Sequence, residues 1–170
     1  LIKAEYTNIA LDATLTASGA IDEDSSKDYV NDDLLSMYKN ACWEFIDDYV
    51  FETIITGEAT FNFDLNGTKD VVAVMVYNSK NEDKIFKEIK KVELVAVIDG
   101  KDTVITISNL QFDLKQFART DDDGVAEYVQ PGSVVFAEFN ALKVKSVKFT
   151  IDVPEGQDAV GISEIRILGK

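Results

Sequence analysis

"EATFNFDLNGTKDVVAVMVYN", residues 58–78, decides the fold of this chain. From Ala59 to Leu65 apolar and polar residues alternate, and a period of two is typical of a β-strand with one face in the core. Asn66-Gly67 then gives a turn signal, and residues 70–78 are apolar on both faces, as in a central buried strand. The stretch therefore predicts two consecutive strands joined by a tight turn.

Strand patterns continue on both sides of this stretch. Residues 90–98 and 101–108 flank Asp99-Gly100 and predict a β-hairpin. Further strands are predicted at 13–18, 133–139, 144–153 and 161–168. About eight strands with turn signals and long loops predict an all-β fold, an antiparallel β-sandwich of jelly-roll type.

Helical patterns are short and few. Residues 31–39 and 81–91 each predict a helix of one to three turns, with Asn31 and Asn81 as N-caps and acidic residues in the first turn. We therefore expect one or two short helices beside the sandwich. The 170 residues fit one module spanning 1–170, and because the first residue is Leu1 we expect it to be excised from a larger multimodular protein.

The charge balance excludes several partners. The chain has 31 acidic and 17 basic residues, for a net charge of −14. Nucleic acids and anionic membrane surfaces bind through Lys and Arg, so both are disfavoured. No apolar run approaches the roughly 20 residues of a membrane-spanning helix, so we expect no membrane insertion.

The chain has no histidine and one cysteine. The absence of histidine excludes the usual catalytic bases and most zinc sites. Cys42 cannot form an internal disulfide, and its apolar neighbourhood beside Trp43 favours an inert buried thiol over a nucleophile.

The order of several motifs resembles discoidin-type domains, also called factor V/VIII type C or galactose-binding-like domains. The motifs are "NIALDATLTASG" (8–19), "VNDDLLSMYKNACW" (30–43), "ATFNFDLNGTKDV" (59–71), "VVAVMVYNS" (71–79), "VKSVKFTI" (144–151) and "VGISEIRILGK" (160–170). The resemblance covers residues 8 to 169. The vertebrate disulfide cysteines are absent, which favours the bacterial branch similar to carbohydrate-binding module family 32. Asp33 stands where the family loop has glycine, and an insertion precedes Trp43.

The resemblance implies a structural calcium ion held by an early loop and the last strand. The positions that match are Asp32, Asp33, Ser36 and Glu164, and either Asn31 or Asp32 corresponds to the family aspartate. Calcium takes six to eight oxygen ligands, which these residue types supply. In the alternative interpretation, the two aspartates lie at a helix N-terminus and Glu164 is solvated.

The resemblance also implies a sugar site on loops at one end of the sandwich. Such a site needs an aromatic platform and planar polar side chains. The candidates are Tyr49, Asn78, Arg119 and Tyr128, whereas we expect Trp43 to pack in the core. Because family sites often use a histidine, galactose specificity is not expected here.

The sequence thus predicts a non-catalytic carbohydrate-binding module of a secreted or cell-surface bacterial protein, accessory to a glycoside hydrolase. Its expected partners are a glycan and the neighbouring domains of the parent protein. The alternative is a structural or protein-interaction domain that packs against a catalytic neighbour without binding sugar. A glycosidase would need only two carboxylates, for which Glu138 and Glu164 are candidates, but acidic residues are so abundant that a pair is uninformative.

Overall fold

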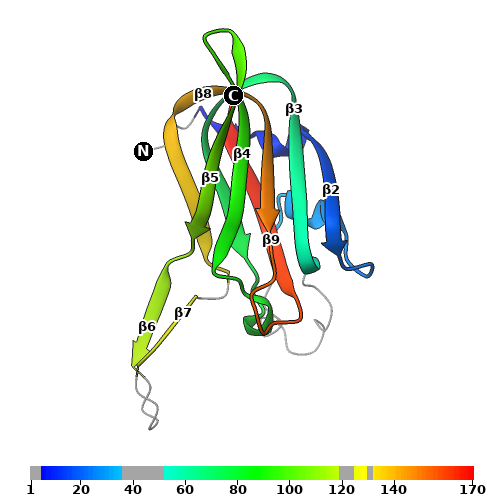
Figure 1. Ribbon diagram of the computed structural model, residues 1–170, viewed down its shortest axis with the longest axis vertical. Helices are drawn as coiled ribbons and strands as arrows, with labels where there is room; N and C mark the ends of the chain where they lie inside the picture. The colour runs from blue at the N-terminus through cyan, green and yellow to red at the C-terminus, as the bar shows by residue number, and fades with distance from the viewer. Residues whose placement is uncertain (1–4, 36–51, 119–124, 130–131) are drawn as a thin grey trace.

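The computed structural model describes residues 5–35, 52–118, 125–129 and 132–170, and its architecture is drawn in Figure 1. Strands dominate, and the helical elements of the described part are short 3₁₀ turns. In chain order the elements are β1 (Thr7–Asn8), η1 (Ile9–Asp12), β2 (Thr14–Ile21), η2 (Lys27–Asn31), β3 (Thr53–Asn78), η4 (Glu82–Lys84), β4 (Glu88–Ile98), β5 (Lys101–Gln111), β6 (Leu114–Ala118), β7 (Val125–Val129), β8 (Val134–Ile151) and β9 (Val160–Gly169).

The strands β3 and β8 each run through both layers of a sandwich. The first half of β3 pairs with the second half of β8, for example Ala59 with Ile151, and the second half of β3 pairs with the first half of β8, for example Tyr77 with Val134. β3 turns between these halves at Asn66-Gly67, where φ is 56° and 135°. The predicted pair of strands is thus confirmed, and the structure joins it into one element.

The pairing of the other strands completes two layers (Figure 1). One layer contains β2, the first half of β3, the second half of β8, β4 and β5. The other contains β1, β9, the second half of β3 and the first half of β8. The predicted hairpin is confirmed, because Ile98 pairs with Lys101 and both Asp99 and Gly100 have positive φ. The predicted all-β sandwich is correct.

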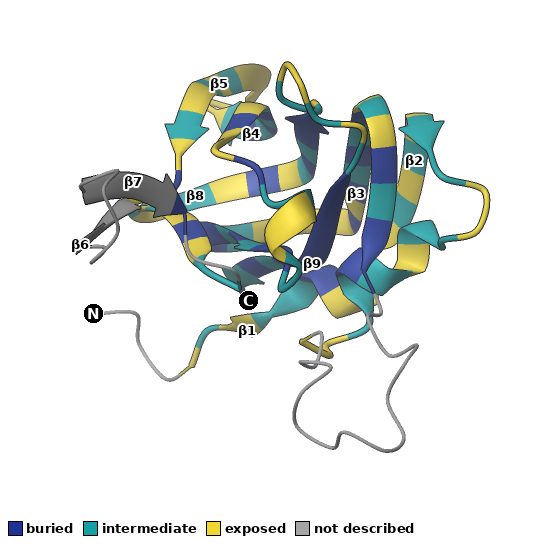
Figure 2. Ribbon diagram, turned by 90° about the horizontal axis from the view of Figure 1, so that it is seen from below, coloured by how far each residue is buried: buried dark blue, intermediate teal, exposed yellow. Residues whose placement is uncertain are grey.

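The core lies between the two layers. Alternate residues of β3 and β8 point inward, and Phe63 meets Phe149 edge to face with ring centroids 5.8 Å apart. Ile165 and Ile167 of β9 face them from the other layer and are fully buried. Figure 2 shows buried residues along the inner strands and exposed residues on the outer elements. Full burial of each large apolar side chain contributes about 1.5–3 kcal/mol.

The opening "NIA" has a structural explanation in the pairing of the first and last strands. Asn8 Oδ1 accepts hydrogen bonds from the main-chain N–H of Ala10 and of Ile167, both at 3.2 Å. The side chain therefore caps η1 and at the same time fastens β1 to β9. The Asn8 side chain thus links the N-terminal segment to the last strand.

The helix prediction over 81–91 is wrong, and the one over 31–39 is wrong for its described residues. Asn81 does cap a turn, since its side chain accepts from Asp83 N–H, but the turn is η4, and the residues from Glu88 onward form β4. In the segment 31–39, Asn31 is the last residue of η2, whose N-cap is Ser26, and residues 36–39 lie outside the described part. The β6–β7 hairpin was not predicted.

The two ends of the sandwich differ. The Asn66-Gly67 and Asp99-Gly100 turns lie at one end with the C-terminus, whereas the β3–β4 and β8–β9 connections lie at the other, here called the loop end (Figure 1). Within the described residues, no helix has the length and apolar character needed to cross a membrane.

Candidate functional site

Two connections lie side by side at the loop end and form its surface. They are residues 79–87, between β3 and β4, and residues 152–159, between β8 and β9. Gln157 fastens them together, because its Nε2 donates to Ile85 O at 2.9 Å and to Ala159 O at 3.4 Å. We call this contact the Gln157 clasp.

The β3–β4 connection is held in place by a buried carboxylate. Glu52 is 1% exposed; its Oε1 accepts from Ser79 Oγ at 2.6 Å and its Oε2 from Lys80 N–H at 2.9 Å. The neighbouring strand must leave room for this carboxylate, since a Cβ on Gly161 would come within 2.5 Å of Oε1. Glu52 and Gly161 together therefore fix where the loop begins.

Asn78 was predicted to contact sugar, and the structure assigns it another task. It is fully buried, its Nδ2 donates to Phe86 O at 2.7 Å, and its Oδ1 accepts from the N–H of Phe86 and of Ser79. Both ends of the amide are used inside the protein, so Asn78 shapes the loop and does not face a ligand. Its position next to the loop end was correct, but its orientation was not.

Two hollows flank the Gln157 clasp. The first, the loop hollow, has a volume of about 400 Å³ and is lined by residues that include Asn81, Asp83, Lys84, Gln157 and Asp158. The second, the strand hollow, has a volume of about 500 Å³ and is lined by residues that include Phe86, Glu88, Lys90, Asn109, Gln111 and Asp152. Both volumes lie in the range of small-ligand sites, roughly 300–1,000 Å³. No sequence pattern predicted the strand hollow, since its walls come from three distant segments.

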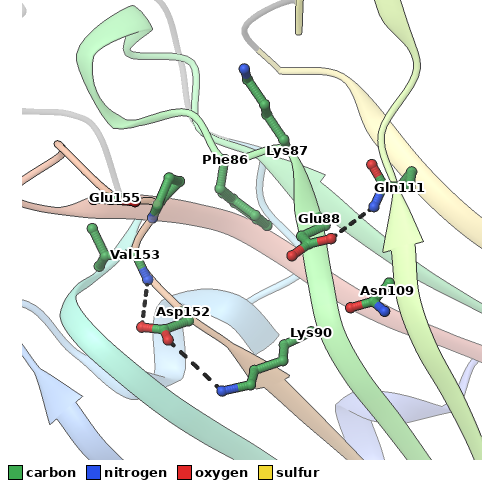
Figure 3. A pocket seen from close by; sticks show the side chains of 10 residues that line it. Phe86, Lys87, Glu88, Lys90, Asn109, Gln111, Asp152, Val153 and Glu155 are labelled. Atoms are coloured by element: carbon green, nitrogen blue, oxygen red, sulfur yellow. Dashed lines mark hydrogen bonds and ion pairs between the residues drawn. The ribbon is translucent and has the colours of Figure 1, made fainter.

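Polar side chains line both walls of the strand hollow (Figure 3). On one side Gln111 donates to Glu88 at 2.7 Å. At the base Lys90 pairs with Glu58 and lies 3.9 Å from Asp152. The hydrogen bond from Lys90 lowers the pKa of Glu58, and the same bond raises the pKa of Lys90. Of the charged residues that line this hollow, Lys90 and Asp152 are thus paired within the protein.

The aromatic platform expected of a sugar site is not formed by the described residues of the two hollows. Phe86 lines the strand hollow but is 1% exposed, and its ring packs edge to face on Phe112 at 5.1 Å. Tyr49 and Arg119 lie outside the described residues, and Tyr128 lies on β7 with a side chain outside them too. These three candidates therefore stay predictions.

Three of the proposed metal ligands are described: Asp32 and Asp33 lie on the loop after η2, and Glu164 lies on the last strand. Glu164 is fully buried, and neither of its carboxylate oxygens has a hydrogen-bond partner. Burial first, and then the adjacent Asp32 carboxylate, raise the pKa of Glu164 to about 9, while Arg166 acts in the opposite direction. Glu164 is thus not solvated, which overturns the alternative interpretation for this residue.

The surrounding groups fit a cation only in part. Asn31 Oδ1 is also buried without a partner, whereas the Asp33 carboxylate lies 3.4 Å from Arg166 Nη2. In the described part of the chain, three acidic side chains do not gather around one point, and Ser36 lies outside it. Asp32 and Glu164 fit calcium if carbonyl or amide oxygens complete the set, which is common in such sites. A bound cation would favour the ionised form of Glu164.

The candidate glycosidase pair is not arranged for catalysis. Glu138 lies opposite Ala73 on β3, and Glu164 lies opposite Tyr77 on the same strand. Four residues along a strand span about 13 Å, whereas the carboxylates of glycosidases lie about 5–9.5 Å apart. Since Glu164 is also buried, these two residues do not form a glycosidase site.

Comparisons with known proteins identify the fold. No protein-family model and no curated sequence matches the chain. Among solved structures, it is similar to the family 32 carbohydrate-binding module of C. perfringens NanJ in complex with galactose, with a TM-score of 0.58 and 11% identity over 96% of this chain and 98% of that one. A fucose-binding module of Streptococcus pneumoniae aligns over 100% of both chains, with a TM-score of 0.57 and 12% identity.

A third similar structure holds a different ligand. A family 32 module of Clostridium perfringens, in complex with GalNAc-β-1,3-galactose, aligns over 95% of this chain and 99% of that one with a TM-score of 0.54 and 14% identity. Identities this low establish the architecture alone. The chain therefore has the galactose-binding-like β-sandwich fold of discoidin-type domains, the fold of the family 32 carbohydrate-binding modules that it resembles.

Proposed function

We propose that the chain is a non-catalytic carbohydrate-binding module that holds a secreted or cell-surface bacterial protein near its glycan substrate. The observation that carries the proposal is the pair of hollows at the loop end, each lined by acidic and amide side chains. Such planar polar groups pair with sugar hydroxyls. They lie on the two connections in the loop hollow, and on β4, β5 and the β8–β9 connection in the strand hollow. The solved structures in complex with sugars have the same fold.

Sugar contacts in this proposal come from two sets of residues. Asn81, Asp83 and Asp158 line the loop hollow and offer hydrogen-bonding groups. Tyr49, Arg119 and Tyr128 remain the proposed aromatic and cationic contacts. The parent protein is proposed to be multimodular, and several weak modules on one chain would raise the effective concentration at the substrate.

Glycan-array screening tests this function. We expect the intact protein to bind at least one neutral glycan, and Asp158→Ala, Arg119→Ala and Tyr128→Ala each to weaken that binding about tenfold, as loss of one or two hydrogen bonds or a stacking contact implies. Asp12→Ala is the control, since Asp12 is an exposed acid near the Asn66-Gly67 turn at the opposite end. Silence across a broad array would refute sugar binding.

A second candidate function rests on the outer face of the second layer. Phe136 is 52% exposed and pairs with Met75, and Val134 is 37% exposed and pairs with Tyr77, so the four residues share one outward face. An exposed apolar patch of this kind favours a domain that packs against its catalytic neighbour in the parent protein. Phe136→Ser would then release that neighbour in a pull-down with separately expressed parent domains, without changing glycan binding.

We also propose a structural calcium ion held by Asp32, Glu164 and the loop that contains Asp33 and Ser36. Two buried carboxylate oxygens without partners support this, because burying such a group without a compensating charge costs several kcal/mol. The cation would fasten the loop after η2 to β9. Its removal should therefore lower the melting temperature of the protein.

A further inference from the structure

The strand hollow continues the loop hollow along one seam. Residues 81–84 and 156–159 wall the loop hollow, and the next residues of the same two connections, 86–88 and 152–155, wall the strand hollow. Ile85, whose carbonyl accepts the hydrogen bond of the Gln157 clasp, lies in the chain between Lys84 of the loop hollow and Phe86 of the strand hollow. The two hollows therefore lie in succession along the boundary of the two connections, and one extended molecule can reach both.

The far wall of the strand hollow is formed by β5 and presents two amides. Asn109 and Gln111 are two residues apart and both line the hollow, facing the 152–155 segment (Figure 3). Gln111 is engaged by Glu88, whereas the Asn109 amide has no hydrogen-bond partner among the described residues. An exposed amide that carries both a donor and acceptors suits a sugar hydroxyl.

Asn109 also has an unusual backbone. Its φ is 53°, although it lies inside β5, where φ is normally near −120° to −140°. Asn tolerates this left-handed conformation better than most residues, but the conformation still costs energy that the surrounding structure must offset. Such outliers gather at ligand sites, so the backbone and the unpaired amide point independently to the same place.

The charges of the seam restrict the ligand. Three carboxylates and two lysines line the strand hollow, and two carboxylates and one lysine line the loop hollow. With a chain charge of −14, the field at the seam repels carboxylated or sulfated sugars. A neutral oligosaccharide meets no such repulsion.

We propose that the strand hollow is a second sugar subsite, so that the loop end binds an extended stretch of a neutral oligosaccharide across the Gln157 clasp. The inference rests on the proposed carbohydrate-binding function and adds to it the length and charge of the ligand. One sugar unit fills the loop hollow, and units further along the chain reach Asn109 and Gln111.

Isothermal titration calorimetry over a length series tests the subsite. The probes are oligosaccharides of one to six units from β-1,4-galactan, xylan, β-1,3-glucan and N-acetylated chitin, with heparin fragments as the anionic probe. For the intact protein we expect at least one neutral series to gain tenfold or more in affinity with length, and no binding of heparin. Asn109→Gly keeps the positive φ while removing the amide, so this variant and Gln111→Ala should reduce the gain to below threefold.

Two further variants make the result decisive. Asp158→Ala, in the loop hollow, should weaken binding at every length, and Asn66→Gly is the matched control, because Asn66 has a φ of 56° at the opposite end. Affinity that is independent of length, or a gain with length that survives in both β5 variants, would overturn the subsite and leave sugar binding intact. Absence of binding to every probe and on the glycan array would overturn both proposals.

Discussion

Chelation of calcium is expected to lower the melting temperature of the protein by about 10 °C. A cation held at a thousand times its dissociation constant stabilises the fold by about 4 kcal/mol, and a domain of this length changes by about 2–4 °C for each kcal/mol. Scanning calorimetry with calcium and with excess EGTA measures the shift. Glu164→Gln and Asp32→Asn should remove the calcium response, whereas Glu58→Gln, on the exposed face of β3, should keep it.

The calcium-free protein should also have a characteristic pH dependence. The pKa of Glu164 is raised from 4.5 to about 9 by burial and by Asp32, so the folded state favours the protonated carboxyl group. The unfolded chain releases this proton near pH 4.5, and the folded chain holds it until about pH 9. The contribution of Glu164 to stability is therefore greatest below pH 4.5 and decreases as the pH rises to 9, by about 3 kcal/mol at pH 7.

Urea denaturation in EGTA at pH 5, 7 and 9 measures this loss. Glu164→Gln has no proton to release, so it should flatten the pH dependence and make the calcium-free protein more stable at pH 8. A melting temperature that is the same in calcium and in EGTA would reject the metal. If the stability of the calcium-free wild-type protein does not depend on pH, the raised pKa of Glu164 is rejected.

Glu52→Ala is expected to reduce the free energy of unfolding by about 3–5 kcal/mol, because each of the two hydrogen bonds that the Glu52 carboxylate accepts contributes about 1.5–3 kcal/mol. Ser79 Oγ and Lys80 N–H would lose their acceptors, and the β3–β4 connection would lose its fixed start. Glu52→Gln should cost less, because one oxygen remains to accept. Since that connection walls both hollows, glycan affinity should decrease together with stability.

Gly161→Ala provides an independent measure of the same contact. Its methyl group would lie 2.5 Å from Glu52 Oε1, so the single substitution should destabilise the protein by displacing the carboxylate. In the Glu52→Ala background that clash is absent, and the contacts of 3.0 and 3.2 Å with Ser79 remain. Gly161→Ala should therefore cost less, which a double-mutant cycle detects as coupling. Additive effects, or a loss below 1 kcal/mol for Glu52→Ala, would contradict the assigned role.

The sequence predicted the strands because their signals are local. Alternation from Ala59 to Leu65 and the two Xaa-Gly turns each require only a few neighbouring residues, and the structure confirms them. The helix over 81–91 failed because Asn81 caps a turn of three residues, after which pairing with β5 and β8 overrides the helical pattern of "KIFKEIKK".

The candidate site was predictable only where the resemblance reached it. Asp32 and Glu164 are more than a hundred residues apart in sequence, and their proximity came from the family pattern. Asn78 was placed at the correct end, but its burial depends on how the chain turns back at Phe86. Asn109 and Asp152 line the same hollow although they are distant in sequence. No local sequence pattern predicts that the fold brings them together.

The passage of β3 and β8 through both layers has a consequence for how the protein opens. In a sandwich whose layers share no strands, one sheet can detach while the other stays paired. Here each layer contains half of the same two strands, so loss of the β3–β8 pairing removes hydrogen bonds from both at once. Amide hydrogens of Phe61 and Val74, in opposite layers, should therefore exchange with solvent at similar rates, through one cooperative opening.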